Sequence, residues 1–479
     1  MLGSDLLEIF KHLTKQDRRE LNDFVRSPYH NKREDVISLF DHLDKHLRDD
    51  PSVLKDSATK AMGQVLKKEN VFKAVFVNAK NYDDKQLRYT MSFLLKCIKQ
   101  FLIYKDLSAN ELSSEIKLNR ALRQRGADKA FEKNIQQSFA VLDNQDLRHA
   151  DFYFYKYRLQ MVEYEFLHRR QRSGDLHLQE VSDSLDAFYM VEVLRLACSM
   201  KSHQSVTQRT YTMAFLNEVL DKIETGAYQP TPSVSAYYFA YKALSNNAQR
   251  VDFQALKDII VEKSAIFPQT EIRDLTLFAI NFCIKKLNLG EREYELEALD
   301  LYKNGLQTGS FLESGEISPY TYTNVMLLAV KNGEFDWSAQ FLTDFKKYLP
   351  ARERENLFKY NLALFYFRKK DYPKAMQLLQ EVTLKDVLYN LDARRVLMRI
   401  YYELGEYDAL NSLLESFTIF IHRQKDLGYH RQNYLNLIKF VKKLLQINLK
   451  NKKERAILRG QIESTSELTE RDWLLEQLI

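Results

Sequence analysis

The sequence predicts an all-α fold, a right-handed superhelix of antiparallel helix pairs. Only 13 Gly and 8 Pro occur in 479 residues, well below average usage of roughly 7% and 5%, so few residues interrupt helices. An acidic-aromatic turn recurs as Glu334-Phe335, Asp371-Tyr372 and Glu406-Tyr407, with aromatic spacings of 37 (372 − 335) and 35 (407 − 372) residues. Apolar segments of helix length flank each turn. A repeat of this length predicts an α-solenoid, in which each hairpin buries its apolar face against its neighbours.

Four parts are predicted along the chain: an N-terminal helical region (1–108), a degenerate helical-repeat region (109–317), regular repeats (318–422), and C-terminal helices with a cap (423–479). In the first part, Thr14 and Asp17 form a capping box that opens a helix. Ser27-Pro28 ends this helix, because the residue before proline disfavours helical geometry. Asp50-Pro51 interrupts the chain again, and a long helix is predicted over residues 83–105.

The helix over 83–105 admits two interpretations. Its basic residues Lys85, Arg88, Lys96 and Lys99 lie largely off its apolar face, as on a solvated surface. A basic helix that follows two shorter helices is also typical of a helix-turn-helix recognition helix. This second interpretation gives the alternative function, a nucleic-acid-associated regulator with a repeat region as sensor.

His42 and His46 are four residues apart, a spacing that can bind zinc on a helix. The sequence offers no glutamate beside His42 and no third ligand, so no metal site is predicted. The cysteines Cys97, Cys198 and Cys283 are scattered in apolar segments and predict buried thiols without a disulfide framework.

The aromatic run 152–157 continues at helical spacing and predicts a long buried helix. Its basic end, residues 168–172, suits the helix dipole, although aromatic and basic groups together also suit single-stranded nucleic acid. Ser173-Gly174 is the predicted internal boundary. One helix is predicted over 211–223, and two helix pairs follow, 234–244 with 253–263 and 275–287 with 292–306. The glycine-containing stretch 305–318 is predicted to be a flexible connection.

Three segments within 318–421 share a packing pattern. The second has Leu362, Ala363, Tyr366, Ala375, Leu379 and Val382 at its packing positions. A shift of 35 residues gives Leu397, Met398, Tyr401, Leu410, Leu414 and Phe417, and a shift of −37 gives Val325, Met326, Ala329, Ser338, Leu342 and Phe345. Pro350 closes the first unit. This pattern resembles the tetratricopeptide repeat (TPR) family, whose helix pairs form a superhelix.

The resemblance implies a non-enzymatic protein–protein interaction scaffold that binds a partner segment in a concave groove lined by the first helix of each pair. Cations and tyrosines there would suit an acidic segment or a C-terminal carboxylate. The groove residues implied by the resemblance are Lys331, Tyr360, Leu364, Arg368, Arg395, Arg399 and Tyr402.

The C-terminal part has opposite charges in succession. Residues 439–459 hold eight basic residues and one acidic residue, whereas 463–476 carry five acidic residues against Arg471. Thr469 and Asp472 are predicted to cap a last helix. Either this acidic segment folds back near the basic helix, or an anionic partner binds the basic patch, defined as Lys442, Lys443, Lys450, Lys452 and Lys453.

Local motifs of catalysis are missing from the sequence. It has no glycine-rich phosphate loop, GxSxG, HExxH or CxxC pair, so neither an enzyme nor a cofactor is predicted. The N-terminus lacks a signal-peptide pattern, and no apolar run reaches ~18 residues. We expect a cytoplasmic protein whose partner is a protein or peptide, with an acidic segment as one candidate.

Overall fold

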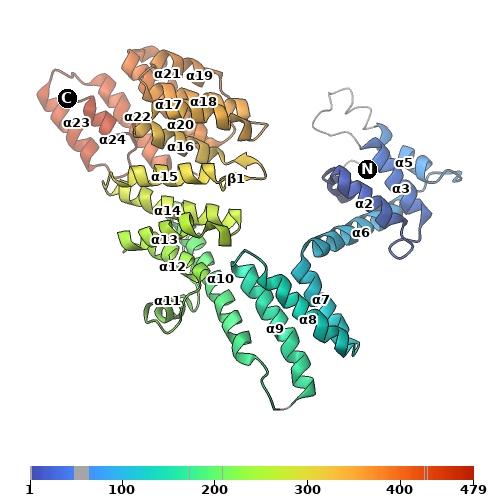
Figure 1. The fold of residues 1–479 in the computed structure, drawn as a ribbon. Coiled ribbons are helices and arrows are strands. Elements are labelled where there is room, and N and C mark those ends of the chain that lie inside the picture. The colour runs from blue at the N-terminus through green and yellow to red at the C-terminus, as the bar shows by residue number, and fades with distance from the viewer. Residues whose placement is uncertain (1–2, 48–63, 172, 208, 425–426, 429) are drawn as a thin grey trace. The chain divides into compact units, whose positions relative to one another are not determined.

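The structure is a computed structural model that describes residues 3–47, 64–171, 173–207, 209–424, 427–428 and 430–479 (Figure 1). Helices dominate it, and the single sheet among the described residues has two short strands. The all-α prediction is therefore confirmed. The chain forms two compact units, Met1–Asn144 with Tyr155–Leu178, and Gln145–Phe154 with Gln179–Ile479. The finer division into four parts stays a prediction.

The first unit has its own apolar core, built from the buried faces of its N-terminal helices. The helices that contribute residues to this unit are α1 (Asp5–Lys11), α2 (Lys15–Arg26), α3 (Glu34–His46), α5 (Lys68–Val75), α6 (Asp84–Ala109), α7 (Glu111–Gln124), α8 (Asp128–Asp143) and most of α9 (Ala150–Arg170). The predicted break at Asp50-Pro51 lies outside the described residues.

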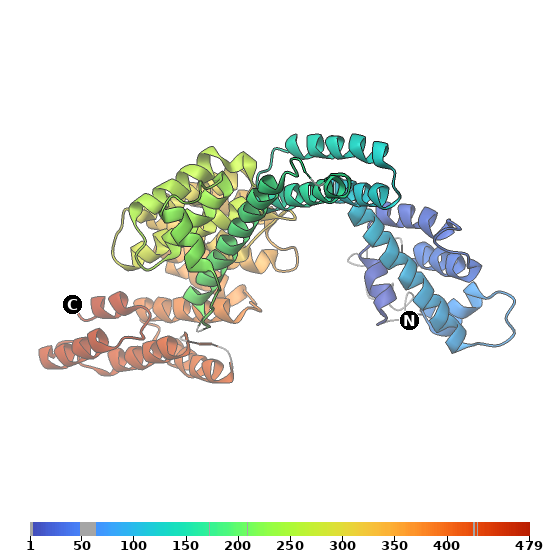
Figure 2. The same cartoon turned by 90° about the horizontal axis from the view of Figure 1, so that it is seen from below.

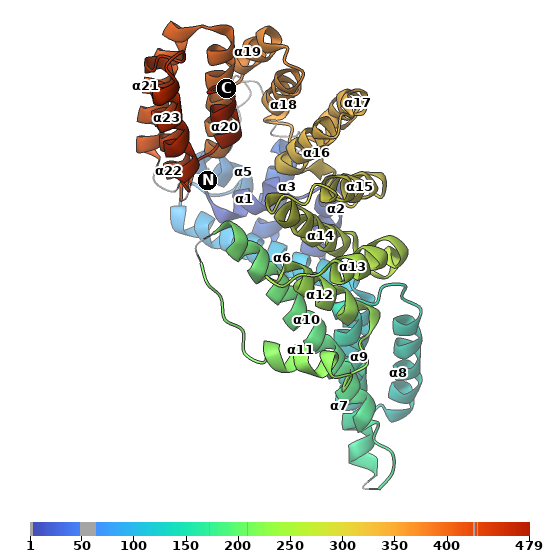
Figure 3. The same cartoon turned by 90° about the vertical axis from the view of Figure 1, so that its left-hand side faces the viewer.

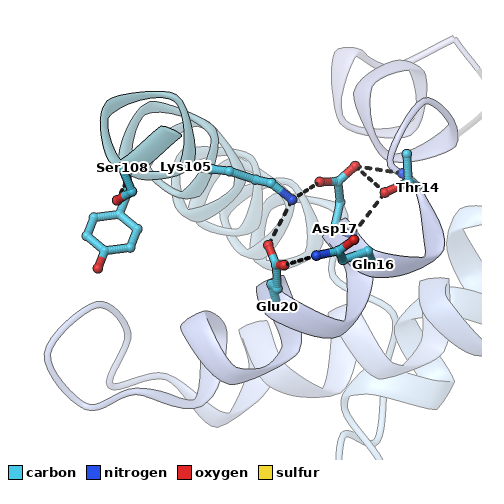
Figure 4. Close-up of polar contacts among 7 residues, drawn as sticks. Thr14, Gln16, Asp17, Glu20, Lys105 and Ser108 are labelled. Atoms are coloured by element: carbon cyan, nitrogen blue, oxygen red, sulfur yellow. Dashed lines mark hydrogen bonds and ion pairs between the residues drawn. The ribbon is translucent and has the colours of Figure 1, made fainter. Parts of the chain in front are cut away.

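The start of α2 confirms the predicted capping box. The Thr14 hydroxyl accepts from the Asp17 amide at 3.1 Å, and the Asp17 carboxylate accepts from the Thr14 amide at 2.8 Å. Lys105 then joins α6 to this turn, with Nζ at 2.6 Å from Asp17 and 2.8 Å from Glu20 (Figure 4). Gln16 donates to the other Glu20 oxygen at 2.8 Å. One lysine therefore links the last turns of α6 to the first turn of α2.

Lys105 should make the stability of the first unit depend on pH. Its hydrogen bond, with that of Gln16, lowers the pKa of Glu20. Burial opposes the shift at Asp17, but hydrogen bonds from Lys105 and Thr14 outweigh it and lower that pKa too. Because the pKa values of these two carboxyl groups are lower in the folded state than in the unfolded state, their ionisation stabilises the fold. This stabilisation is present above the unfolded values of 3.8 and 4.5 and is lost as the pH falls through the folded values. K105M should lower the Tm most near pH 7 and progressively less below about pH 4.

Thermal melts of the full chain from pH 2 to pH 7 measure this dependence. The matched control is K99M, since Lys99 is an exposed lysine of α6 that forms no ion pair with the described residues. A Tm difference between K105M and wild type that does not change with pH would contradict the assigned contacts.

The remaining features of the first unit follow the simpler interpretations. The aromatic run 152–157 lies in α9, which confirms the predicted helix. Arg170 at its basic end pairs with Asp128 at 2.9 Å and also with Glu132. Lys85, Arg88, Lys96 and Lys99 of α6 are exposed, as on a solvated face. Nothing in the described residues of this unit supports the nucleic-acid alternative.

The helices of the second unit are α10 (Leu178–Val206), α11 (Leu216–Glu224), α12 (Pro232–Leu244), α13 (Arg250–Glu262), α14 (Gln269–Asn288), α15 (Tyr294–Gln307), α16 (Pro319–Lys331), α17 (Phe335–Phe345), α18 (Arg354–Arg368), α19 (Tyr372–Glu381), α20 (Val387–Leu404), α21 (Tyr407–Arg423), α22 (His430–Gln446), α23 (Lys452–Ser464) and α24 (Arg471–Glu476). From α12 to α21 they form a row of hairpins, in which the first helix of each pair packs on the second. Figure 3 shows α12, α14 and α16 in one row and α13, α15 and α17 in another, and Figure 2 shows the C-terminal helices, in red, lying alongside one another.

The repeated turn has the same backbone geometry in all three repeats. The amides of Glu334, Asp371 and Glu406 each donate to the carbonyl five residues earlier, at 2.9 Å. The residue before each acid has a positive φ, 80° at Gly333, 62° at Lys370 and 73° at Gly405. This is the left-handed helix terminus that glycine favours. The turn aromatics are the first residues of α17, α19 and α21, so the sequence period marks the helix pairs directly.

Most packing positions of the repeats are buried, as the register predicts, and the others, among them Leu362, Tyr366 and Val382, are partly buried. Ser338, Ala375 and Leu410, which occupy one position of the pattern, are each fully buried. Upstream, α12, α13 and α15 match the predicted ranges within three residues, whereas α14 begins six residues earlier than predicted, at Gln269. The helix predicted from residue 211 begins only at Leu216, because Phe215 adopts a left-handed φ of 64°.

The stretch 305–318 is structured, so the prediction of a flexible connection is wrong. β1 (Leu312–Glu313) pairs with β2 (Glu316–Ile317) in an antiparallel hairpin. Phe311, just before β1, is 3% exposed, and its ring fills the space beside Gly305 in α15. Gly305 allows this close approach of the Phe311 ring. Local composition does not distinguish a glycine with this role from one that makes the chain flexible.

Candidate functional site

The predicted groove residues lie on the first helices of three successive repeats. We call the surface formed by α16, α18 and α20 the first-helix face; α18 contacts both other helices. Lys331 is exposed there and pairs with Glu295. Tyr360 and Leu364 are each only 2% exposed and belong to the core. Arg368 is exposed and forms no ion pair with the described residues.

The C-terminal segment, residues 465–479, covers the part of this face that holds Arg395 and Arg399. Both guanidinium groups donate to Glu470, which comes just before α24. The Arg399 Nη1 lies 2.6 Å from the Glu470 carboxylate. These three side chains are 13%, 17% and 14% exposed, so the ion pairs are largely shielded from water.

Arg395 is also held from within its own helix. Its Nε and Nη2 donate to one oxygen of Asp392 at 2.9 and 2.6 Å, and the Tyr360 hydroxyl donates to the other at 2.6 Å. Burial, together with the Asp392 charge, raises the pKa of Tyr360. The hydroxyl therefore stays protonated and links α18 to α20.

Trp473 is the second anchor of the C-terminal segment. Its indole N–H donates to Glu403 at 2.8 Å, and Tyr402 packs edge-on against its ring at 5.3 Å. The Arg399 guanidinium lies 5.2 Å from the centre of the Trp473 ring and 5.0 Å from that of Phe367. A guanidinium between two aromatic faces gains cation–π stabilisation.

Positive charge is concentrated on this face. Burial, followed by the neighbouring charges of Arg395 and Arg368, lowers the pKa of Arg399 to about 10. The arginine remains protonated near neutral pH, but the crowding of cations makes a nearby carboxylate energetically valuable. The site therefore suits an acidic side chain with an aromatic ring beside it.

Glu470 and Trp473 were not predicted as site residues. The sequence predicts a capping box from Thr469 to Asp472, but α24 begins at Arg471 and has no side-chain cap hydrogen bond. Glu470 instead turns its carboxylate to the arginines, because two buried guanidinium groups stabilise it more than one exposed amide. The available signal was opposite charge on segments about 70 residues apart, which local periodicity does not pair.

The acidic C-terminal segment forms ion pairs with the arginines of α20 and not with the basic patch, which stays in contact with solvent. Lys442, Lys450, Lys452 and Lys453 are exposed. Lys443 is partly buried and donates to Gln461 at 2.5 Å. None of these five lysines forms an ion pair within the described residues, so the patch is a surface with uncompensated positive charge.

The described residues contain no other recognisable chemical site. Their His, Cys, Asp and Glu side chains do not gather into a group of three that could hold a metal. The three cysteines are free and buried, and burial raises the pKa of Cys283 to about 12. Among the described helices, none is both long and apolar enough for a membrane crossing.

Comparison with known proteins adds little to this geometry. No protein-family model matches the chain, and no curated protein matches it. A chain in the crystal structure of the APC/C hetero-tetramer Cut9-Hcn1 is 12% identical, with a TM-score of 0.27, over 98% of this chain and 100% of that chain. Such a low score does not establish a common arrangement. The repeated turns, the buried packing positions and the row of hairpins identify the chain as a TPR-like α-solenoid.

Proposed function

We propose that this protein is a non-enzymatic interaction scaffold that binds a protein segment on its first-helix face. One observation carries the proposal. Arg395 and Arg399 hold the carboxylate of a segment that lies about 70 residues further along the chain. A face that holds such a segment in cis has the charge and aromatic groups needed to hold one in trans.

The exposed cations of the same face extend this surface. Lys331 and Arg368 lie on α16 and α18, beyond the part that the C-terminal segment covers. With Arg395, Arg399 and Tyr402 they would contact an acidic partner, whereas the buried Tyr360 and Leu364 would shape the surface from below. We expect the protein to act in the cytoplasm without a cofactor.

The proposal predicts that charge reversal at Lys331 and Arg368 removes partners. Tagged full chain should capture proteins from extracts of the cells that make it, and nuclease treatment should leave them bound. K331E/R368E should reduce their recovery about tenfold, as loss of about 1.4 kcal/mol of binding free energy would. K442E/K450E, which makes the same charge change in the basic patch, is the matched control.

Equal recovery with K331E/R368E and wild type would contradict binding on the first-helix face. Loss of all captured proteins on nuclease treatment would contradict the scaffold and favour a nucleic-acid partner. If only K442E/K450E reduced the recovery of proteins, the binding surface would be the basic patch and not the first-helix face.

A further inference from the structure

The C-terminal segment contacts the first-helix face in the way that a bound peptide would. It presents two anchors three residues apart, the carboxylate of Glu470 and the indole of Trp473, and both reach α20. Glu470 immediately precedes α24, and Trp473 lies in the first turn of that helix. One short turn therefore fills both the charged and the aromatic parts of the site.

The backbone at Glu470 is left-handed. Its φ is 59°, in a region that non-glycine residues adopt less often. Such geometry persists where surrounding contacts impose it, and it is common in ligand clamps and switches. At Glu470 the surrounding contacts include the ion pairs with the two arginines.

Arg395 and Arg399 would differ in their remaining contacts if Glu470 were removed. Arg395 would keep its two hydrogen bonds to Asp392, but Arg399 would have no carboxylate in direct contact within the described residues. The Nε of Arg399 is already buried without a hydrogen-bond partner among the described residues. An arriving carboxylate could accept from this nitrogen and from Nη2, which point to the same side of the guanidinium, a two-pronged geometry that arginine favours.

We propose that residues 465–479 occupy the binding site of the partner and compete with it from within the same chain. The partner, in this account, is a protein segment with an acidic side chain followed three residues later by tryptophan. It displaces residues 465–479 from α20, so the scaffold is closed until such a segment competes. Tryptophan is required because its N–H satisfies Glu403 while its face stacks on Arg399. This inference rests on the proposed function and names the chemistry of its ligand.

A peptide of this chain's own residues 465–479, labelled with fluorescein, tests the inference by fluorescence anisotropy. It is titrated with full-length wild type, with E470K/W473A, whose C-terminal segment is released, and with W473A alone. E467K is the matched control, because Glu467 is exposed, lies in the same segment and contacts neither arginine through its side chain. Circular dichroism verifies that each variant keeps its helices.

E470K/W473A should bind the peptide at least tenfold more tightly than wild type, since a segment held in cis acts as a competitor of high local concentration. W473A should be intermediate and E467K should match wild type. A peptide carrying Glu470→Gln and Trp473→Ala should bind none of them. Equal binding to wild type and E470K/W473A, or no binding to the folded E470K/W473A, would overturn the inference.

The inference and the proposed function can fail separately. Proteins could be captured through Lys331 and Arg368 while release of the C-terminal segment changes neither the peptide affinity nor the recovery of these proteins. This result would refute competition by residues 465–479 and leave the proposed scaffold function intact. If the peptide binds the released variant but neither form captures a protein, the scaffold is refuted and residues 465–479 are only a structural cap.

Discussion

G305A should lower the free energy of unfolding of the second unit by about 1–2 kcal/mol. A Cβ at this position would collide with the Phe311 ring. That ring packs against Tyr302 at 5.6 Å between centroids and is almost fully buried, so it has little room to move. Overpacking a core costs roughly 1–3 kcal/mol, and the upper part of this range exceeds the ~1 kcal/mol gained by removing a helical glycine.

G460A is the matched control, with the opposite expected sign. Gly460 lies inside α23, and a Cβ there meets no atom within 4 Å. The substitution should therefore stabilise the protein by about 0.5–1 kcal/mol. Urea unfolding of both variants, followed by circular dichroism, measures the two effects. A stabilising G305A would contradict the close packing of α15 against the hairpin.

E470K should destabilise the docked C-terminal segment by about 3–5 kcal/mol, the cost of breaking a buried ion pair by removal of one partner. The variant places a third cation against Arg395 and Arg399, whose side chains are only 13% and 17% exposed. R399E/E470K reverses the pair and should recover part of the loss. E467K should change the free energy of unfolding by less than about 0.5 kcal/mol, as expected for an exposed position.

The repeats were predictable because their signal is local. The turn aromatics at Phe335, Tyr372 and Tyr407 recur with the helix pairs, and small or apolar residues keep the same offsets. These offsets fix which faces meet, so the buried positions follow from the period alone. The capping box at Thr14 was predictable for the same reason, since its partners are three residues apart.

The contacts that shape the candidate site were not predictable from local pattern. Glu470 meets Arg395 and Arg399 only after the chain has turned back through α22 and α23. The sequence could place acids and bases in the C-terminal part, but it offered no means to choose between Arg399 and the basic patch as their partner. Gly305 shows the same limit, because the close approach of Phe311 depends on the hairpin.

The docking of the C-terminal segment on the first-helix face is tested most directly by the fluorescence of Trp473. The chain has two tryptophans, so W337F leaves Trp473 as the only tryptophan whose emission can be excited selectively. The indole is 3% exposed and beside Arg399. We expect blue-shifted emission with little quenching by iodide or acrylamide, both in W337F and with E467K added. Adding E470K should shift the emission to the red and expose it to both quenchers. Emission from W337F that is already red-shifted and fully quenched would contradict the account, because the segment would not be docked on α20 in solution.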